Sequence, residues 1–165
     1  MKKDLVSHRH VITCLVDNEF GVLARVIGLF SGRGYNIESL TVASVNTSQN
    51  LSRITIVTSG SDMVIEQIKS LLERIVPVHK VVDLTTQGSY VERELALLKV
   101  MAEGKNRAEV LKIADEFRAR VVDSTKNSYV FEVTNTPAEI DTFINLLEPM
   151  GLLEVTRTGS TAISR

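Results

Sequence analysis

The clearest candidate for ligand chemistry is the segment Asp17-Asn18-Glu19-Phe20-Gly21-Val22-Leu23, which joins a predicted strand to a predicted helix. A helix start presents backbone N–H groups without intrahelical partners and the positive end of the helix dipole, and both favour an anion. Gly21 lets a ligand approach the backbone, and the Asn18 amide offers donors and an acceptor. These features suit a small zwitterion that carries a carboxylate and an ammonium group. A purely structural interpretation stays open, in which Asn18 caps the helix and Gly21 makes the turn.

The other reactive side chains do not indicate catalysis. His8 and His10 lie two residues apart and His79 lies far along the chain, so no set of residues has the spacing of metal ligands. Cys14 stands between Thr13 and Leu15 in a predicted strand, where a buried apolar role is expected rather than a nucleophilic one. The sequence has no GxGxxG after a strand and no GxxxxGK[ST]. We therefore expect no catalytic residue, no metal site and no phosphate-binding loop.

The composition argues against several further classes of protein. The chain has 165 residues, a net charge of -1, 44% hydrophobic residues and one cysteine. A nucleic-acid-binding protein usually carries a basic excess, and no apolar run approaches the roughly 18 residues that would span a bilayer. The segment 1–7 lacks the apolar core of a secretory signal. We expect a cytoplasmic protein that binds neither nucleic acid nor membrane.

Hydrophobic periodicity in the first half of the chain predicts one βαββαβ unit. Runs rich in Val, Ile and Thr indicate strands, and apolar residues at helical spacing indicate helices. The predicted order is a strand at 10–17, a helix at 21–32, strands at 37–45 and 51–58, a helix between Ser61 and Pro77, and a strand at 78–84.

The same pattern returns after a polar, glycine-bearing segment. Strands are predicted at 95–101 and 152–156, with a hairpin formed by 121–122 and 129–133. One helix is predicted to begin at Asn106, with Glu109 as the other half of a capping box. A second is predicted to begin at Thr136-Pro137-Ala138-Glu139, which places an N-cap, a first-turn proline and a capping glutamate in succession.

We therefore predict an α+β protein with two ferredoxin-like βαββαβ domains in tandem, each an antiparallel sheet with its helices on one face. The predicted boundaries are a first domain at 8–84, a linker at 85–91 and a second domain at 92–165. The face opposite the helices carries Val11 and Leu15, so we expect a dimer mate or another partner to contact it. A fold this common does not identify a function.

Longer stretches of sequence resemble a known family. DNEFGVLARV at 17–26 looks like the opening of an ACT domain, a ferredoxin-like module that binds small amino acids. IGLFSGRGYNIESLTV at 27–42 closely resembles the small regulatory subunit of acetolactate synthase. The segments LSRIT at 51–55, VEREL at 91–95 and EVTRTG at 154–159 extend the resemblance over nearly the whole chain.

The resemblance implies a regulatory role in branched-chain amino acid biosynthesis. In this family the catalytic large subunit is a separate chain that carries thiamine diphosphate, magnesium and FAD, and the small subunit itself has no cofactor. The small subunit forms a homodimer through its ACT domains, activates the large subunit and confers feedback inhibition, usually by valine. Valine lies between two ACT domains, and the matching residues are Asn18, Gly21, Val22 and Leu23 of one chain with Asn36 and Ile37 of its partner.

Two other functions remain open beside this one. The chain could be a free-standing ACT-domain amino-acid sensor that regulates a different enzyme. A ferredoxin-like domain can also be an enzyme, but this would require a convergent polar cluster that the sequence does not indicate. Copurification with a thiamine-dependent partner would distinguish these alternatives.

Overall fold

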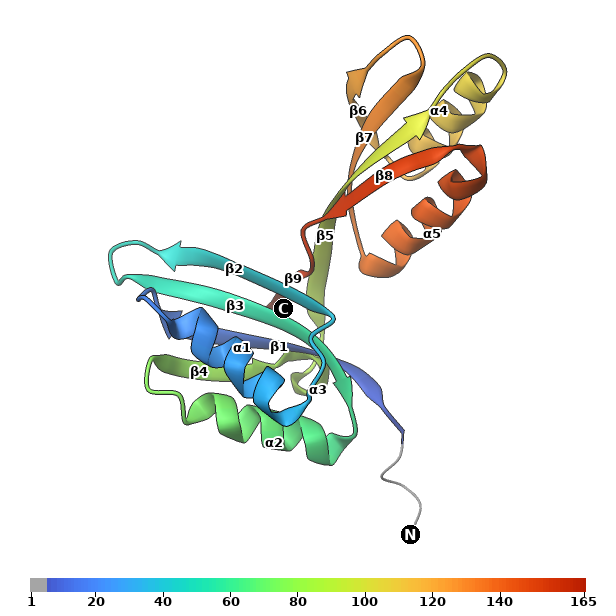
Figure 1. Cartoon of the computed structure of the whole chain (residues 1–165). Coiled ribbons are helices and arrows are strands. Elements are labelled where there is room, and N and C mark those ends of the chain that lie inside the picture. Colours follow the sequence, from blue (N-terminus) through green and yellow to red (C-terminus); the bar gives the residue numbers. More distant parts are fainter. Residues whose placement is uncertain (1–5) are drawn as a thin grey trace. The chain divides into compact units, whose positions relative to one another are not determined.

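The structure is a computed structural model that describes residues 6–165 (Figure 1). The segment 1–7, considered above for a secretory signal, thus lies mostly outside the described residues. The described chain forms two compact units: the first contains residues 6–91 together with Ser160–Arg165, and the second contains Glu92–Gly159. In the described part of the chain, no helix is long and apolar enough to cross a membrane.

The first unit has the predicted βαββαβ order. Its elements are β1 (His8–Asp17), α1 (Val22–Arg33), β2 (Ser39–Asn46), β3 (Leu51–Gly60), α2 (Asp62–Glu73) and β4 (Val78–Asp83), followed by the short helix α3 (Leu84–Gln87). The strands form an antiparallel sheet in the order β2-β3-β1-β4, which leaves β2 at one edge. Alternate residues of β1, among them Ile12 and Cys14, pack with Val26 and Phe30 of α1 in one core.

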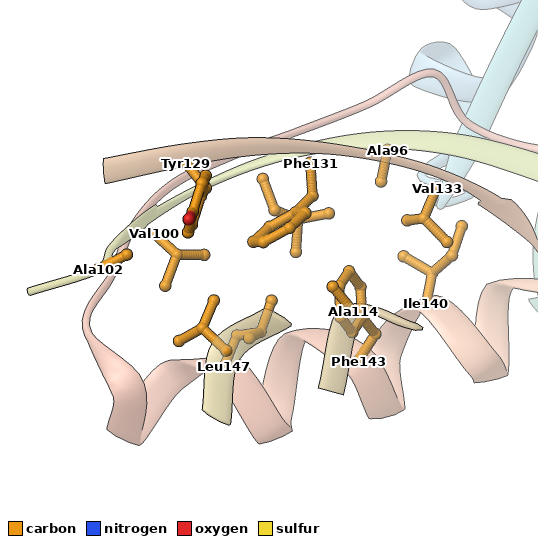
Figure 2. Packing of buried hydrophobic residues seen from close by; sticks show 12 residues of the cluster. Ala96, Val100, Ala102, Ala114, Tyr129, Phe131, Val133, Ile140, Phe143 and Leu147 are labelled. Atoms are coloured by element: carbon orange, nitrogen blue, oxygen red, sulfur yellow. The ribbon is translucent and has the colours of Figure 1, made fainter. Parts of the chain in front are cut away.

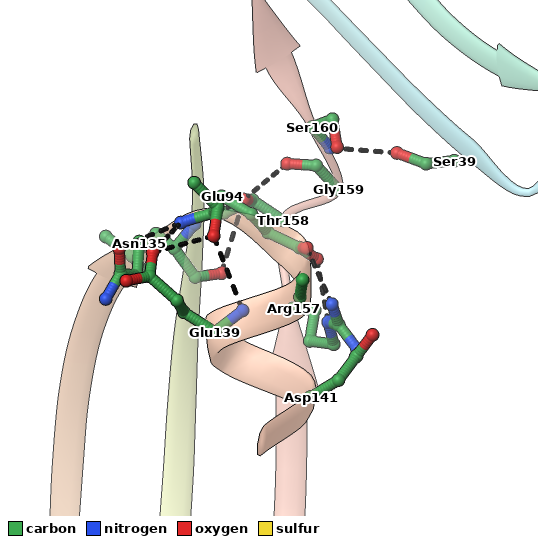
Figure 3. Close-up of polar contacts among 12 residues, drawn as sticks. Ser39, Glu94, Asn135, Glu139, Asp141, Arg157, Thr158, Gly159 and Ser160 are labelled. Atoms are coloured by element: carbon green, nitrogen blue, oxygen red, sulfur yellow. Dashed lines mark hydrogen bonds and ion pairs between the residues drawn. The ribbon is translucent and has the colours of Figure 1, made fainter. Parts of the chain in front are cut away.

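The last residues of the chain partly cover the opposite face of this sheet. Ala162, in β9 (Thr161–Ser164), packs with Val11, Val57 and Leu84 in a second apolar cluster. Ser160 anchors this segment, because its N–H donates to the Ser39 hydroxyl at 2.8 Å (Figure 3). We expected Val11 to contact a partner, but it is fully buried within its own chain. Leu15, on the same face, is only half-buried.

The second unit repeats the arrangement. It contains β5 (Tyr90–Met101) from Glu92 onward, α4 (Asn106–Glu116), β6 (Arg120–Ser124), β7 (Ser128–Asn135), α5 (Pro137–Leu147), the 3-10 turn η1 (Glu148–Met150) and β8 (Leu152–Arg157). The strand order is β6-β7-β5-β8, again antiparallel. Figure 2 shows its core, in which Phe131 and Val133 of the sheet face Ile140, Phe143 and Leu147 of α5. The predicted fold class, two βαββαβ units with antiparallel sheets and helices on one face, is thereby confirmed.

The two predicted helix caps of this unit have opposite outcomes. At α5, Thr136 accepts a hydrogen bond from the Glu139 N–H and the Glu139 side chain returns to the Thr136 N–H, so the capping box is confirmed. At α4 the prediction is wrong: Lys105 is the N-cap residue and no side chain caps the helix. The Asn106 amide instead donates to the carbonyl oxygen of Met150 at 2.6 Å, because this tertiary acceptor competes with the local cap.

A three-residue ion cluster joins β8, β5 and α5 within the second unit. Arg157 donates through two guanidinium nitrogens to the carboxylate of buried Glu94, at 2.8 and 2.7 Å, and through a third to Asp141 at 2.6 Å (Figure 3). The bond to Glu94 raises the pKa of Arg157 above its ordinary value, although partial burial opposes the shift. The pairing satisfies a carboxylate that is only 5% exposed.

The compact units differ from the predicted domains at two places. Part of the predicted linker 85–91 belongs to α3 and β5 rather than to a loop. The predicted second domain ran to residue 165, whereas Ser160–Arg165 groups with the first unit. The physical reason is the apolar cluster around Ala162, since Val11 and Val57 would otherwise face solvent.

Candidate functional site

The start of α1 has the properties of an open anion site. Gly21 is its N-cap residue in the left-handed conformation (φ 84°), with no side-chain cap and no acidic residue in the first turn. The first helical hydrogen bond runs from the N–H of Arg25 to the carbonyl oxygen of Gly21, so the N–H groups of Val22, Leu23 and Ala24 have no helical acceptor. A Cβ atom on Gly21 would meet no atom within 4 Å. The space beside the Cα atom of Gly21 is therefore open.

Asn18 does not cap the helix, so the structural interpretation is wrong on this point, although Gly21 does make the turn. Its backbone is held instead by the β2–β3 hairpin. The Asn18 N–H donates to the carbonyl oxygen of Asn50 at 2.8 Å, and the Asn50 side-chain amide donates to the carbonyl oxygen of Asn18 at 3.1 Å. Within residues 6–165 the exposed Asn18 side chain has no hydrogen-bond partner, which leaves its amide available to a ligand.

Asn36 is held in a similar way at the other end of α1. Its carbonyl oxygen accepts a 2.6 Å hydrogen bond from the hydroxyl of Thr58, a residue that is only 1% exposed. The Asn36 side chain is exposed and, in the described chain, forms no hydrogen bond. The neighbouring Ile37 is half-buried against the core of the first unit.

The two apolar residues at the helix start take different positions. Val22 is 4% exposed and belongs to the core of the first unit, so only its backbone N–H can face a ligand. Leu23 remains 37% exposed and can present its side chain at the surface. The segment 18–23 thus combines a free amide, free N–H groups and one accessible apolar side chain.

One chain does not bring all the predicted site residues together. Gly21 and Asn36 lie beyond opposite ends of α1, whose 12 residues span roughly 18 Å at 1.5 Å per residue. A free amino acid is much shorter than this helix. A ligand at Gly21 can therefore meet an Asn36 side chain only if that side chain belongs to another copy of the chain.

The first unit offers a surface through which two copies could meet. The strand β2 is at the edge of the sheet, where its backbone hydrogen-bonding groups can pair with another strand. Apolar side chains are exposed on this strand and on α1, at 37 to 51% of their area: Leu23, Ile27, Val42 and Val45.

The remaining reactive side chains lie in pairs. His79 and Asp17 are joined at 2.6 Å and His10 and Asp83 at 2.8 Å, and no group of three His, Cys, Asp or Glu side chains in residues 6–165 could hold a metal ion. Burial raises the pKa of the Cys14 thiol from about 9 to about 12. The thiol therefore stays protonated near neutral pH, which is unfavourable for a nucleophile.

Sequence reasoning missed the two residues that position the asparagines. Thr58 lies in a predicted strand, and nothing in the sequence around it indicated that it would position Asn36. Asn50 ends a polar hairpin loop and adopts a positive φ of 52°. Asparagine is among the few non-glycine residues that accept this conformation, which was the available signal, but its contact with Asn18 depends on the antiparallel pairing of β1 with β3.

Comparisons with known proteins cover most of the chain. Residues 12–80 match the model of the AHAS small subunit-like ACT domain, and residues 93–165 match that of the small subunit of acetolactate synthase. The chain is 44% identical to the probable acetolactate synthase small subunit of Archaeoglobus fulgidus, over 95% of this chain and 97% of the relative.

Two further relatives agree. The small subunit of acetolactate synthase isozyme 3 of Escherichia coli is 42% identical over 95% of this chain and 96% of its own length. The crystal structure of the acetolactate synthase small subunit from Thermotoga maritima superposes with a TM-score of 0.87 at 35% identity, covering 96% of this chain and 98% of that one. This chain, as its sequence resemblance predicted, belongs to the family of acetolactate synthase small subunits.

Proposed function

We propose that this protein is a regulatory subunit that binds valine between two ACT domains and thereby controls a separate catalytic large subunit of acetolactate synthase. The observation that carries the proposal is the position of Gly21 and Asn36 at opposite ends of α1. If two first units pair about a two-fold axis along α1 and β2, the helix start of each lies beside Asn36 of the other. This arrangement gives two identical sites per dimer.

Each group at the proposed site has a distinct role. The free N–H groups at the start of α1 and the helix dipole hold the valine carboxylate. Asn18 of the same chain and Asn36 of the partner orient the carboxylate and ammonium groups through their amides. Leu23, with Ile37 of the partner, receives the apolar side chain, and Val22 contributes its N–H.

A site shared by two chains explains how a small ligand can control activity. Valine favours the dimer arrangement in which both halves of the site fit it. If the large subunit is activated by a different dimer arrangement, valine binding and activation oppose each other. Each then weakens the other by the same coupling free energy. Inhibition then requires no contact between valine and the catalytic centre.

We assign the chemistry of the reaction to the large subunit. In residues 6–165 the Cys14 thiol is buried with a raised pKa, and His10 and His79 are each engaged with a single carboxylate. Thiamine diphosphate, magnesium and FAD accordingly belong to the large subunit in this proposal. The small subunit supplies binding, positioning and regulation.

Reconstitution tests the proposal directly. The purified chain alone should form no acetolactate from pyruvate with all three cofactors present. Added to a large subunit from the same genome, it should raise the rate, and valine should reverse the increase. Turnover by the chain alone would refute the regulatory assignment. Valine binding without any effect on, or copurification with, the large subunit would favour a free-standing sensor of a different enzyme.

A further inference from the structure

A cavity of about 350 Å³ lies on the face of the first sheet that is opposite the helices. Its floor is formed by β1, β3 and β4, and its walls include residues of α3 and β9. All its lining residues belong to the first unit. The volume is at the lower end of the range typical of small-molecule sites.

Two cationic side chains face this cavity from either side of Leu15. In the sheet register, Arg53 of β3 and Lys80 of β4 both lie opposite Leu15 of β1, so the three side chains project from the same face. With strands 4.7–4.9 Å apart, the Cα atoms of Arg53 and Lys80 are roughly 9–10 Å from each other. Both long side chains can therefore reach a single small anion above Leu15.

Nothing within the described chain neutralises these two charges. No residue lining the cavity carries a carboxylate, and within residues 6–165 Arg53 and Lys80 take part in none of the ion pairs. The whole chain nevertheless has a net charge of -1. The cavity is thus a local concentration of positive charge on a slightly acidic protein.

The uncharged polar side chains that line the cavity also lack hydrogen-bond partners within the described residues. Thr13 is only 9% exposed, yet its hydroxyl has no hydrogen-bond partner in the described residues. The same holds for the side chains of Gln87 and Ser164, which line the cavity as well. The Thr13 hydroxyl is nevertheless accessible to solvent, since among the described residues His10 Nε2 is the buried side-chain atom that lacks a partner. A free hydroxyl beside two unpaired cations favours an anionic guest.

We propose that this cavity binds a small molecule carrying phosphate or carboxylate groups. Arg53 supplies a planar fork that suits two oxygen atoms of either group, and Lys80 adds a compact charge from the other side. The Thr13 hydroxyl donates a further hydrogen bond, and Leu15 provides an apolar floor. None of the residues proposed to bind valine lines this cavity, so the two sites are separate.

Titration calorimetry on the full chain tests this proposal, with inorganic phosphate and succinate as separate probes at constant ionic strength. Losing a charged hydrogen-bond partner costs roughly tenfold or more in affinity. We expect saturable binding of at least one probe, weakened to that extent in Arg53→Gln and in Lys80→Gln. Lys112→Gln, a control at an exposed lysine in the second unit, should bind as the wild type does.

The two probes also distinguish the ligand class: preference for phosphate indicates a phosphorylated molecule, and preference for succinate a dicarboxylate. Valine binding and calorimetric melting of each variant establish that it is folded, with Arg53→Lys as the milder replacement if Arg53→Gln is not. Saturable binding of neither probe would overturn the proposal, since water alone would then fill the cavity. An equal loss in Lys112→Gln would also overturn it, because the attraction would be a general surface effect. Neither outcome bears on the valine site, which is titrated independently.

Discussion

Asn50 binds both backbone polar groups of Asn18: its carbonyl oxygen accepts from the Asn18 N–H at 2.8 Å, and its side-chain amide donates to the Asn18 carbonyl oxygen at 3.1 Å. The two residues are 32 positions apart. The β2–β3 hairpin, which contains Asn50, therefore fixes the backbone that presents the Asn18 amide. This makes Asn50 a positioning residue for the proposed valine site, although it need not touch valine.

Replacing Asn50 should weaken valine binding without removing any proposed ligand. Asn50→Gly retains the left-handed backbone and loses only the side-chain bond, whose net value of about 0.5–1.5 kcal/mol corresponds to roughly two- to tenfold in affinity. Asn50→Asp should cost more, because a carboxylate then faces the Asn18 carbonyl oxygen. Calorimetry with valine measures both. Asn127→Gly in the β6–β7 hairpin is the control, and an Asn50→Asp variant that binds valine normally would contradict this role.

Gly21 offers a matched pair of replacements that separates backbone strain from charge. Asp and Asn have similar size and both accept the positive φ better than most residues, but only Asp places a negative charge beside the valine carboxylate. At about 4 Å the repulsion is roughly 1–4 kcal/mol, depending on solvent screening. The holoenzyme carrying Gly21→Asp should therefore need about one to three powers of ten more valine for inhibition than the holoenzyme carrying Gly21→Asn. Equal valine sensitivity of the two reconstituted holoenzymes would argue against a carboxylate at the start of α1.

The C-terminal residues should stabilise the first unit. Ala162 is 6% exposed against Val11, Val57 and Leu84, whereas the preceding Thr161 is exposed. Ala162→Asp buries an unpaired charge and should lower the free energy of unfolding by about 1–3 kcal/mol. Thr161→Asp should change it by less than about 0.5 kcal/mol. Differential scanning calorimetry compares the two, and similar melting curves would show that β9 does not contribute to stability.

The raised pKa of Cys14 predicts a loss of stability in alkali. The unfolded chain releases the thiol proton near pH 9, whereas the folded chain keeps it up to about pH 12. The stabilisation that the protonated Cys14 thiol gives the folded chain is therefore complete below pH 9 and is lost as the pH rises towards 12. By about pH 10 the loss amounts to about 1.4 kcal/mol. Urea unfolding at about pH 8 and pH 10 should show a larger loss for the wild type than for Cys14→Ala. Equal losses would contradict the assignment.

The parts of the fold that were predictable from sequence depend on local patterns. The two-residue period of a strand places Ile12 and Cys14 on one face of β1, and the Thr136–Glu139 capping box needs only neighbours in the chain. Asn106 has the same local signal, but its amide bonds to Met150, 44 residues away. The position of β9 was not predictable, because four residues carry too little pattern to indicate which unit they join.

The proposed site likewise has features that were predictable from the sequence and features that were not. The segment 18–23 was recognisable because its residues are consecutive and suit one kind of ligand. The support that Asn50 and Thr58 provide depends on strand register, and so does the meeting of Arg53 and Lys80 beside Leu15. A single sequence does not show register, so neither the positioning residues nor the cationic cavity could be predicted.

The central claim, a valine site built from two chains, can be tested by mixing two damaged subunits. One carries Asn18→Ala and the other Asn36→Asp, each with a different affinity tag, and the heterodimer is isolated by two successive purifications. Each homodimer should bind valine weakly, because both of its sites contain one damaged residue. In the heterodimer one site collects both changes and the other collects neither.

Calorimetry of this heterodimer is the most direct measurement. Our account predicts that one valine binds per heterodimer with wild-type affinity, half the capacity of the wild-type dimer. If Asn18 and Asn36 instead served a site within their own chain, every site in the heterodimer would stay damaged. No recovery of tight valine binding in a folded heterodimer would contradict the account.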